Sequence, residues 1–331
     1  MSIISFENAD NIASRFLYLL SKHNITPPHN SALESELLSL TQLLDIYRCP
    51  DLVNEYDNSE DVLRNAAGIY DLAAKVLAIE TLPEFEMFLP HLRLISEKKI
   101  KIASIRQNSS GNIQDDTARK FAELYIGCLA IHFGTNIDID SPTSSNGCNP
   151  DVMFTTQFEN TDKPPITWAL AIKTISTQNG QTIFERIKEA TEQINHPRCN
   201  ADKGLVIINV KDALDHHSLW NEKFQNEEDG CLSLKGKIEN LIKKANENRP
   251  LDEWKEIFKG KAVCPILFMG QSLIKIPTIT SENTPTIIRM FVEYNAEQSC
   301  DDEGITVANY LNHYMQSINL GIPGDSSHQP S

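Results

Sequence analysis

Apolar residues recur at three- and four-residue spacing through the first hundred positions of the chain, and this spacing predicts helices. The segments that show it are residues 7–24, 31–47, 59–81 and 84–97. Ser31, with Glu34 three residues on, has the pattern of a helix-capping box. The polar stretch 107–112 breaks the pattern and predicts a boundary. We therefore expect a helical N-terminal domain over residues 1–110. It contains no catalytic cluster of its own, which favours a role in partner or effector binding.

The pattern changes after this break. A helix is predicted from about residue 115 to 133, followed by a loop rich in serine, glycine and asparagine. Apolar runs predict strands over residues 151–156, 166–175, 204–210, 262–270 and 286–296. A helix is predicted over residues 182–194, between the second and third strands. Residues 212–260 are mostly helical and charged. Continuous apolar runs indicate strands covered on both faces, so we expect an α/β domain over 111–320 and a disordered tail over 321–331.

The composition limits the function classes. Of the 331 residues, 40% are hydrophobic and 23% are charged, as in a globular protein. No apolar run reaches membrane-spanning length and the first residues lack a signal-peptide pattern, so we expect a cytoplasmic protein without a membrane partner. The seven cysteines include no CxxC pair, which disfavours a zinc site. A net charge of −15 disfavours a passive nucleic-acid-binding protein, but not an enzyme that uses a local basic groove, bound metal ions or a basic partner.

Three charged residues stand in apolar surroundings. Strand alternation places Lys173 on the same face as Ala171, and the small side chains of this face leave room for another group to approach. Glu123 is the only Asp, Glu, Lys or Arg between Lys120 and Asp138, on a helix that is apolar nearly all round. Asp151 follows Pro150 at the start of an apolar strand. Each residue also has a purely structural explanation: an edge-strand lysine, a buried ion pair and a turn residue.

Taken in chain order, these residues resemble the PD-(D/E)xK superfamily, which has the restriction endonuclease-like fold. The shared order is a helix with a buried acid, a strand that opens with Pro-Asp, a strand that ends in x-Lys, and a helix; it covers about residues 115–210. The resemblance implies a metal-dependent DNA endonuclease. Glu123, Asp151 and the main-chain carbonyl of Ile172 would bind Mg²⁺ or Mn²⁺, and Lys173 would position and polarise the attacking water. By analogy, the setting is prokaryotic defence or restriction, with a protein partner or a homo-oligomer.

The chain departs from this motif at Ala171, where the superfamily has a second acid. Three explanations are open: the acid has migrated to the following helix, it has been removed by an introduced substitution, or it has been lost naturally. Natural loss would leave a catalytically inactive module that acts through protein contacts. The candidates for a migrated acid are Glu185, Glu189 and Glu192, with Gln193 as a supporting residue. Thr182-x-x-Glu185 also has the pattern of a capping box, which gives Glu185 a competing role.

These assignments lead to two expectations about geometry. Glu123, Asp151 and Lys173 should converge on one cleft that Ala171 lines, and a glutamate at position 171 should fit there without disturbing the core. Two weaker features remain. His216 and His217 are expected to form an exposed pair. A basic strip for phosphates, or simply a solvated helix face, is formed by Lys235, Lys237, Lys243 and Lys244.

Overall fold

The structure is a computed structural model that describes residues 6–49, 59–97, 103, 105, 117–142, 149–158, 164–278, 283–296 and 300–318. At its centre lies a six-stranded mixed sheet with the strands in chain order. The strands are β1 (Thr135–Ile139), β2 (Val152–Thr156), β3 (Ile166–Thr174), β4 (Lys203–Asn209), β5 (Ile266–Ile276) and β6 (Thr284–Tyr294). β3, β4 and β5 run parallel, whereas β1–β2, β2–β3 and β5–β6 pair antiparallel. The predicted α/β class is confirmed.

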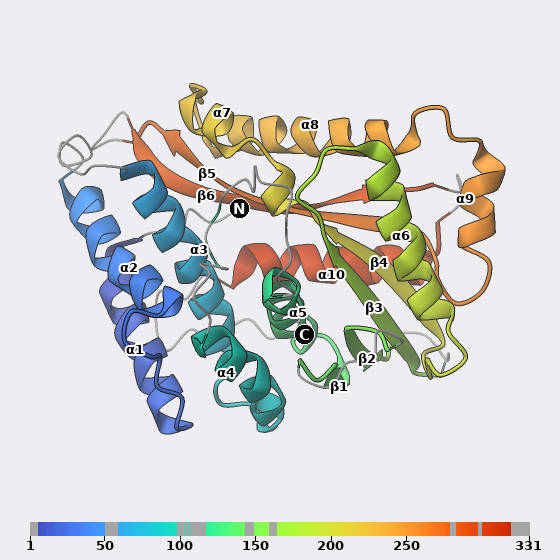
Figure 1. The fold of residues 1–331 in the computed structure, drawn as a ribbon, viewed down its shortest axis with the longest axis horizontal. Helices are drawn as coiled ribbons and strands as arrows, with labels where there is room; N and C mark the ends of the chain where they lie inside the picture. Colours follow the sequence, from blue (N-terminus) through green and yellow to red (C-terminus); the bar gives the residue numbers. More distant parts are fainter. Residues whose placement is uncertain are drawn as a thin grey trace.

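Helices surround this sheet (Figure 1). The N-terminal part contains η1 (Phe6–Asn8), α1 (Ala9–Lys22), α2 (Ala32–Arg48), α3 (Ser59–Ala78), η3 (Pro83–Phe88) and α4 (Leu89–Glu97), where η denotes a 3₁₀ helix. The remainder contains α5 (Thr117–Ala130), α6 (Gly180–Asn195), η4 (Lys211–Ala213), α7 (His216–Asn221), α8 (Glu227–Asn246), α9 (Leu251–Ile257) and α10 (Asp302–Ser317). α6 connects the parallel strands β3 and β4, as a crossover helix does.

Both faces of the sheet are buried. On one face, Trp168, Leu170 and Ile172 of β3 pack in a cluster that also holds apolar residues of α1 to α5 and α10. On the other face, Ala169 and Ala171 pack in a second cluster with residues of α6, α8 and α9. The N-terminal helices therefore share a core with the sheet. The group that approaches the small face of β3 is α6.

Most of the predicted elements are present, and their ends differ by a few residues. Two elements were missed, β1 and α10. In β1 only Ile137 and Ile139 are buried, the pairing with β2 shifts register between Thr135 and Asp138, and Asn136 has a φ of 52°. The predicted boundary at 107–112 and the predicted tail at 321–331 lie outside the described residues. Within the described parts, no helix is both long and apolar enough to cross a membrane.

The two predicted helix caps have different outcomes. Ser31 caps α2 as predicted, since its side chain accepts the N–H of Glu34. The cap at Thr182 is wrong, because α6 begins earlier. Its N-cap is Asn179, whose Oδ1 accepts the N–H of Thr182 at 3.0 Å. The asparagine side chain satisfies a backbone donor of the first turn, and this fixes where α6 starts behind β3.

Candidate functional site

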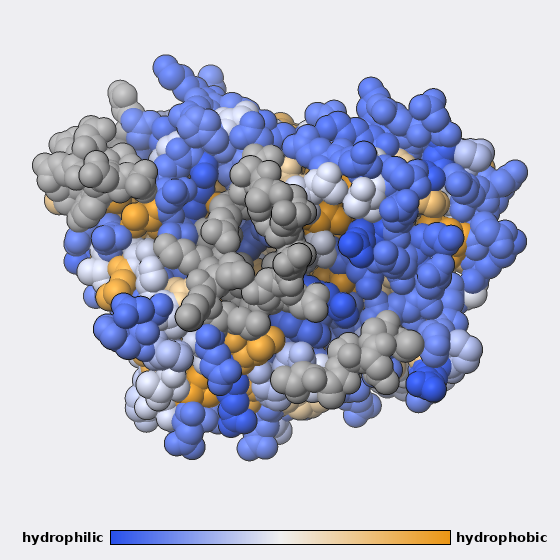
Figure 2. All heavy atoms as spheres, viewed as in Figure 1, coloured by the Kyte–Doolittle hydropathy of each residue, from blue (hydrophilic) through white to orange (hydrophobic). Residues whose placement is uncertain are grey.

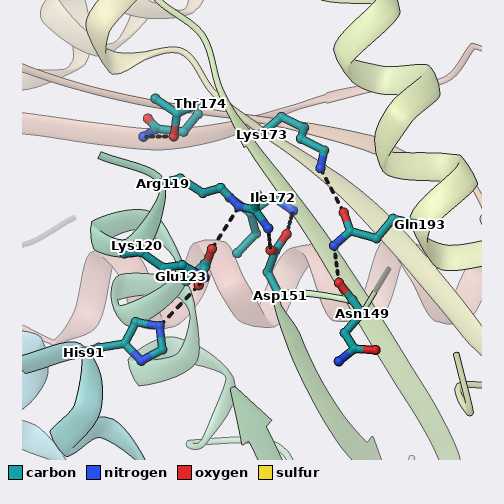
Figure 3. A network of polar contacts seen from close by, with 11 residues as sticks. His91, Arg119, Lys120, Glu123, Asn149, Asp151, Ile172, Lys173, Thr174 and Gln193 are labelled. Atoms are coloured by element: carbon teal, nitrogen blue, oxygen red, sulfur yellow. Dashed lines mark hydrogen bonds and ion pairs between the residues drawn. The ribbon is translucent and has the colours of Figure 1, made fainter. Parts of the chain in front are cut away.

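Glu123 and Asp151 lie on two sides of one arginine, Arg119 (Figure 3). Arg119 Nε donates to Glu123 Oε1 at 3.0 Å, and its Nη2 donates to Asp151 Oδ1 at 2.6 Å. Arg119 and Glu123 are one turn apart on α5, and Asp151 directly precedes β2. Both carboxylates are fully buried, whereas the Arg119 side chain is 25% exposed. The two predicted acids therefore share one cation, the guanidinium group.

The second oxygen of Asp151 is held by the backbone of β3. The N–H of Ile172 donates to Asp151 Oδ2 at 2.6 Å, and the Asp151 N–H donates to the Leu170 carbonyl at 3.0 Å. Burial and the nearby Glu123 carboxylate raise the pKa of Asp151, although Arg119 and Lys173 act in the opposite direction. Ile172 contacts the acid through its N–H. The role of its carbonyl as a metal ligand remains a prediction.

Glu123 receives two further donors. Lys120 Nζ lies 2.7 Å and His91 Nε2 3.2 Å from Glu123 Oε2. Burial acts to raise the pKa of Glu123, but the hydrogen bond from His91 and the ion pairs with Lys120 and Arg119 outweigh it and lower that pKa. An ionised carboxylate only accepts, so His91 donates from Nε2. His91 Nδ1 is buried and has no partner in the described part of the chain.

The site predicted from the sequence did not include the three residues that bond to Glu123, namely His91, Arg119 and Lys120. Arg119 and Lys120 stand four and three residues before Glu123 on the same helix, a spacing that brings side chains together. That spacing was available in the sequence. His91 lies on α4, and nothing in its local pattern indicates a contact with α5. The N-terminal helices therefore supply a side chain to the candidate site.

Lys173 is tied to α6. Its Nζ donates to Gln193 Oε1 at 2.9 Å, and Gln193 Nε2 donates to the main-chain carbonyl of Asn149, two residues before Asp151. Burial lowers the pKa of Lys173, and the Asp151 and Glu189 carboxylates partly oppose this. Lys173 and Asp151 thus lie within electrostatic range of each other. Gln193, the predicted supporting residue, thus bonds directly to Lys173.

Ala171 has no exposed surface and belongs to the apolar cluster beneath α6. The expectation that Ala171 lines a cleft is therefore wrong, because the residue is buried against α6. The candidates for a migrated acid are all exposed on α6 and interact within that helix: Glu185 with Gln181, Glu189 with Arg186, and Glu192 with Lys188. Glu189 is the candidate that also influences the pKa of Lys173.

The fit of a divalent cation can be judged from the donor set. The described residues contain no group of three or more His, Cys, Asp or Glu side chains that could hold a metal ion. All four oxygens of Glu123 and Asp151 already accept hydrogen bonds. The Arg119 guanidinium is nevertheless a cation that bonds both Glu123 Oε1 and Asp151 Oδ1, where a metal ion would lie. Mg²⁺ often uses only one or two carboxylates together with water, so two carboxylates are a donor set of the kind that Mg²⁺ or Mn²⁺ takes, and in this structure Arg119 bonds to both of them.

A cavity of about 300 Å³ lies between α8 and the segments that follow β3 and β4. Ligands of α/β proteins often bind at such carboxyl ends of parallel strands. Three lysines of the predicted basic strip line the cavity, namely Lys237, Lys243 and Lys244. Lys235 does not line it and pairs with Glu239 at 3.7 Å. Figure 2 shows a largely hydrophilic surface over α6 and α8.

The predicted exposed histidine pair is wrong for His216. Its Nε2 lies 2.7 Å from the Lys211 carbonyl and its Nδ1 lies 2.9 Å from Ser272 Oγ, both in the buried interior. The carbonyl can only accept, so Nε2 carries the proton. Burial lowers the pKa of His216 to about 3, so the ring is neutral at physiological pH. His217 is exposed.

Comparison of the chain with protein-family models, curated proteins and solved structures gives no match.

Proposed function

We propose that this chain is a metal-dependent DNA endonuclease with a restriction endonuclease-like domain. One observation carries the proposal: Glu123 and Asp151, from two separate elements, share one guanidinium, and Lys173 of a third element is held close enough for its charge to act on the pKa of Asp151. Arg119 joins Glu123 to Asp151, and Gln193 joins Lys173 to Asn149 beside Asp151. The order α5, β1, β2, β3, α6, β4 also contains the helix, two strands and helix in the sequence that the resemblance implies.

The residues can be given separate roles. A bound Mg²⁺ or Mn²⁺ would stabilise the negative charge that develops during phosphodiester hydrolysis and make its bound water more acidic. Glu123 and Asp151 would hold the cation, and the Ile172 N–H fixes the orientation of Asp151. Lys173 would position a water molecule or a phosphate oxygen. Gln193 holds the lysine ammonium at the C-terminal end of β3.

DNA is the substrate that the resemblance implies, and its phosphodiester backbone requires local positive charge on the protein. In a chain of net charge −15, Lys237, Lys243 and Lys244 gather at one cavity beside the ends of β3 and β4, which Asp215 and Glu247 also line, and Lys237 pairs with Glu222 at 3.0 Å. Such lysines would bind phosphates and bring the strand towards Lys173. A protein partner or a homo-oligomer, and a role in prokaryotic defence or restriction, are part of the proposal by analogy with the superfamily.

A second candidate function is a catalytically inactive module of the same fold that acts through protein contacts. Two observations favour it. Ala171 provides no carboxylate and is packed in the core, and Arg119 already compensates the two remaining acids. Natural loss of the second acid would produce this arrangement.

A plasmid digest separates the two candidates. Supercoiled plasmid would be incubated with Mg²⁺ or Mn²⁺ and either the wild-type chain, Lys173→Met or Lys188→Met; Lys188 is an exposed lysine on α6. The endonuclease predicts metal-dependent nicking that falls by about 100-fold or more in Lys173→Met, within the usual range for a group that assists proton transfer, and is unchanged in Lys188→Met. Nicking that is absent in all three proteins contradicts the endonuclease and favours the inactive module, whereas equal nicking in all three contradicts the catalytic role of Lys173.

A further inference from the structure

We propose that Arg119 is an internal competitor for the divalent cation, and that its guanidinium has to leave Glu123 and Asp151 before the cation binds. This inference rests on the proposed function, because the cation is the one that the endonuclease would use. It adds a regulatory residue to the site. Arg119 blocks the two acids through ion pairs within the chain, and the acids become available when a divalent cation replaces it.

The geometry makes Arg119 a competitor rather than a neighbour. Two different nitrogens of one planar group bond the two acids, Nε to Glu123 Oε1 at 3.0 Å and Nη2 to Asp151 Oδ1 at 2.6 Å. These oxygens face the same position. A guanidinium holds its donors in a fixed fork, so it cannot stay on both acids while a second cation lies between them.

Burial separates the cation that can leave from the one that cannot. The Arg119 side chain is 25% exposed, whereas the Lys120 side chain is 5% exposed. Of the two acids, Lys120 contacts Glu123. When Arg119 leaves, Glu123 keeps Lys120 and His91, and Asp151 keeps the Ile172 N–H. Removing one partner of a buried ion pair without replacement is strongly destabilising. The favourable process is therefore exchange of Arg119 for another cation.

A phosphodiester gives the displaced side chain a new partner. Arginine binds phosphate through two parallel hydrogen bonds, as it does a carboxylate. DNA that reaches the site would therefore draw Arg119 from the acids and favour cation binding. Because coupling between two ligands is reciprocal, the cation should bind more tightly when DNA is present, and this coupling should depend on Arg119.

The test is a calorimetric titration of Mn²⁺ into the full chain, in the wild type, Arg119→Met and Arg15→Met. Arg15 is a matched control, because it also forms a partly buried ion pair. Its partner is Glu80, at 2.8 Å, and neither residue belongs to the candidate site. We expect Arg119→Met to bind Mn²⁺ about tenfold or more tightly than the wild type, because the cation no longer has to displace two hydrogen bonds between charged groups. Arg15→Met should match the wild type, and Asp151→Asn added to Arg119→Met should abolish the gain.

Equal or weaker Mn²⁺ binding by Arg119→Met would overturn the proposal. If that variant does not fold, Arg119→Lys replaces it. Lysine keeps the charge but loses the fork, so Mn²⁺ affinity should still rise, and an unchanged affinity would again overturn the proposal. The DNA digest distinguishes this inference from the proposed function. Tighter Mn²⁺ binding without cleavage would support competition and contradict the endonuclease. Cleavage that depends on Asp151, together with unchanged Mn²⁺ affinity in Arg119→Met, would support the endonuclease and contradict competition.

Discussion

His91 of α4 donates its Nε2–H to Glu123 of α5 at 3.2 Å, and both side chains are buried. The N-terminal helices therefore help to hold an acid of the candidate site. We expect His91→Leu to lower the free energy of unfolding by about 1–3 kcal/mol, because Glu123 loses a donor and stays buried. His91→Gln keeps an N–H donor and should recover part of the loss. Urea unfolding measures both variants, and a Leu variant as stable as the wild type would show that this hydrogen bond is unimportant.

Lys75 joins the N-terminal helices to the end of α10. Its Nζ lies 3.2 Å from Asp71 Oδ1 and donates to the carbonyls of Met315 at 3.0 Å and Ile318 at 2.7 Å. Burial lowers the pKa of Lys75 from 10.5 to about 7, although Asp71 opposes the shift. In the unfolded chain the pKa returns to its ordinary value, so between about pH 7 and pH 10 the unfolded state binds more protons than the folded state.

Stability should therefore rise with pH across this window, and Lys75 should contribute no slope below it. Lys75→Met removes the titrating group, so the variant should lose this contribution to the slope even if it is less stable throughout. Guanidinium unfolding at several pH values measures the difference. The same slope in the variant and the wild type would mean that the folded-state pKa of Lys75 is not lowered.

A glutamate at position 171 would enter a packed core. Ala171 is fully buried beneath α6, so we expect Ala171→Glu to destabilise the chain by several kcal/mol through the burial of a charge. Ala171→Leu adds bulk without charge and should cost about 1–3 kcal/mol. Thermal unfolding compares the two variants. A glutamate variant that is stable and binds Mn²⁺ would restore the sequence-based expectation of a replaced metal ligand.

The cavity lysines should contribute to DNA affinity. Lys243 and Lys244 line the cavity beside the ends of β3 and β4, and Lys235 of the same helix does not. Lys243→Glu with Lys244→Glu should weaken DNA binding and flatten its salt dependence, by about one unit of slope for each phosphate that the protein no longer neutralises. Fluorescence anisotropy at several salt concentrations tests this. An equal effect of Lys235→Glu would indicate only the general charge of α8.

The sequence predicted the class of fold because helix and strand periodicities are local. It also predicted which acids and which lysine share a region, through the order of their elements. It could not predict that α6 closes over Ala171, since the small face of β3 is compatible with a helix or a ligand. Nor could it predict His91, whose contact depends on how α4 packs against α5. The continuous core shared by the N-terminal helices and the sheet was hidden for the same reason. We therefore expect a chain starting near Ile113 to lose stability as well as any partner or effector binding by the N-terminal helices.

The central claim is that Asp151 serves a metal-dependent cleavage site, and a matched pair of asparagine variants tests it most directly. Asp151 accepts the Ile172 N–H at 2.6 Å, and Asp202 accepts the Thr167 N–H of the same strand at 2.8 Å. Each substitution therefore removes a carboxylate that bonds β3, but only Asp151 lies beside Glu123 and Arg119. The measurement is the rate of Mn²⁺-dependent plasmid nicking. The endonuclease predicts that nicking is lost in Asp151→Asn and kept in Asp202→Asn. Equal rates in these two variants and the wild type would contradict it.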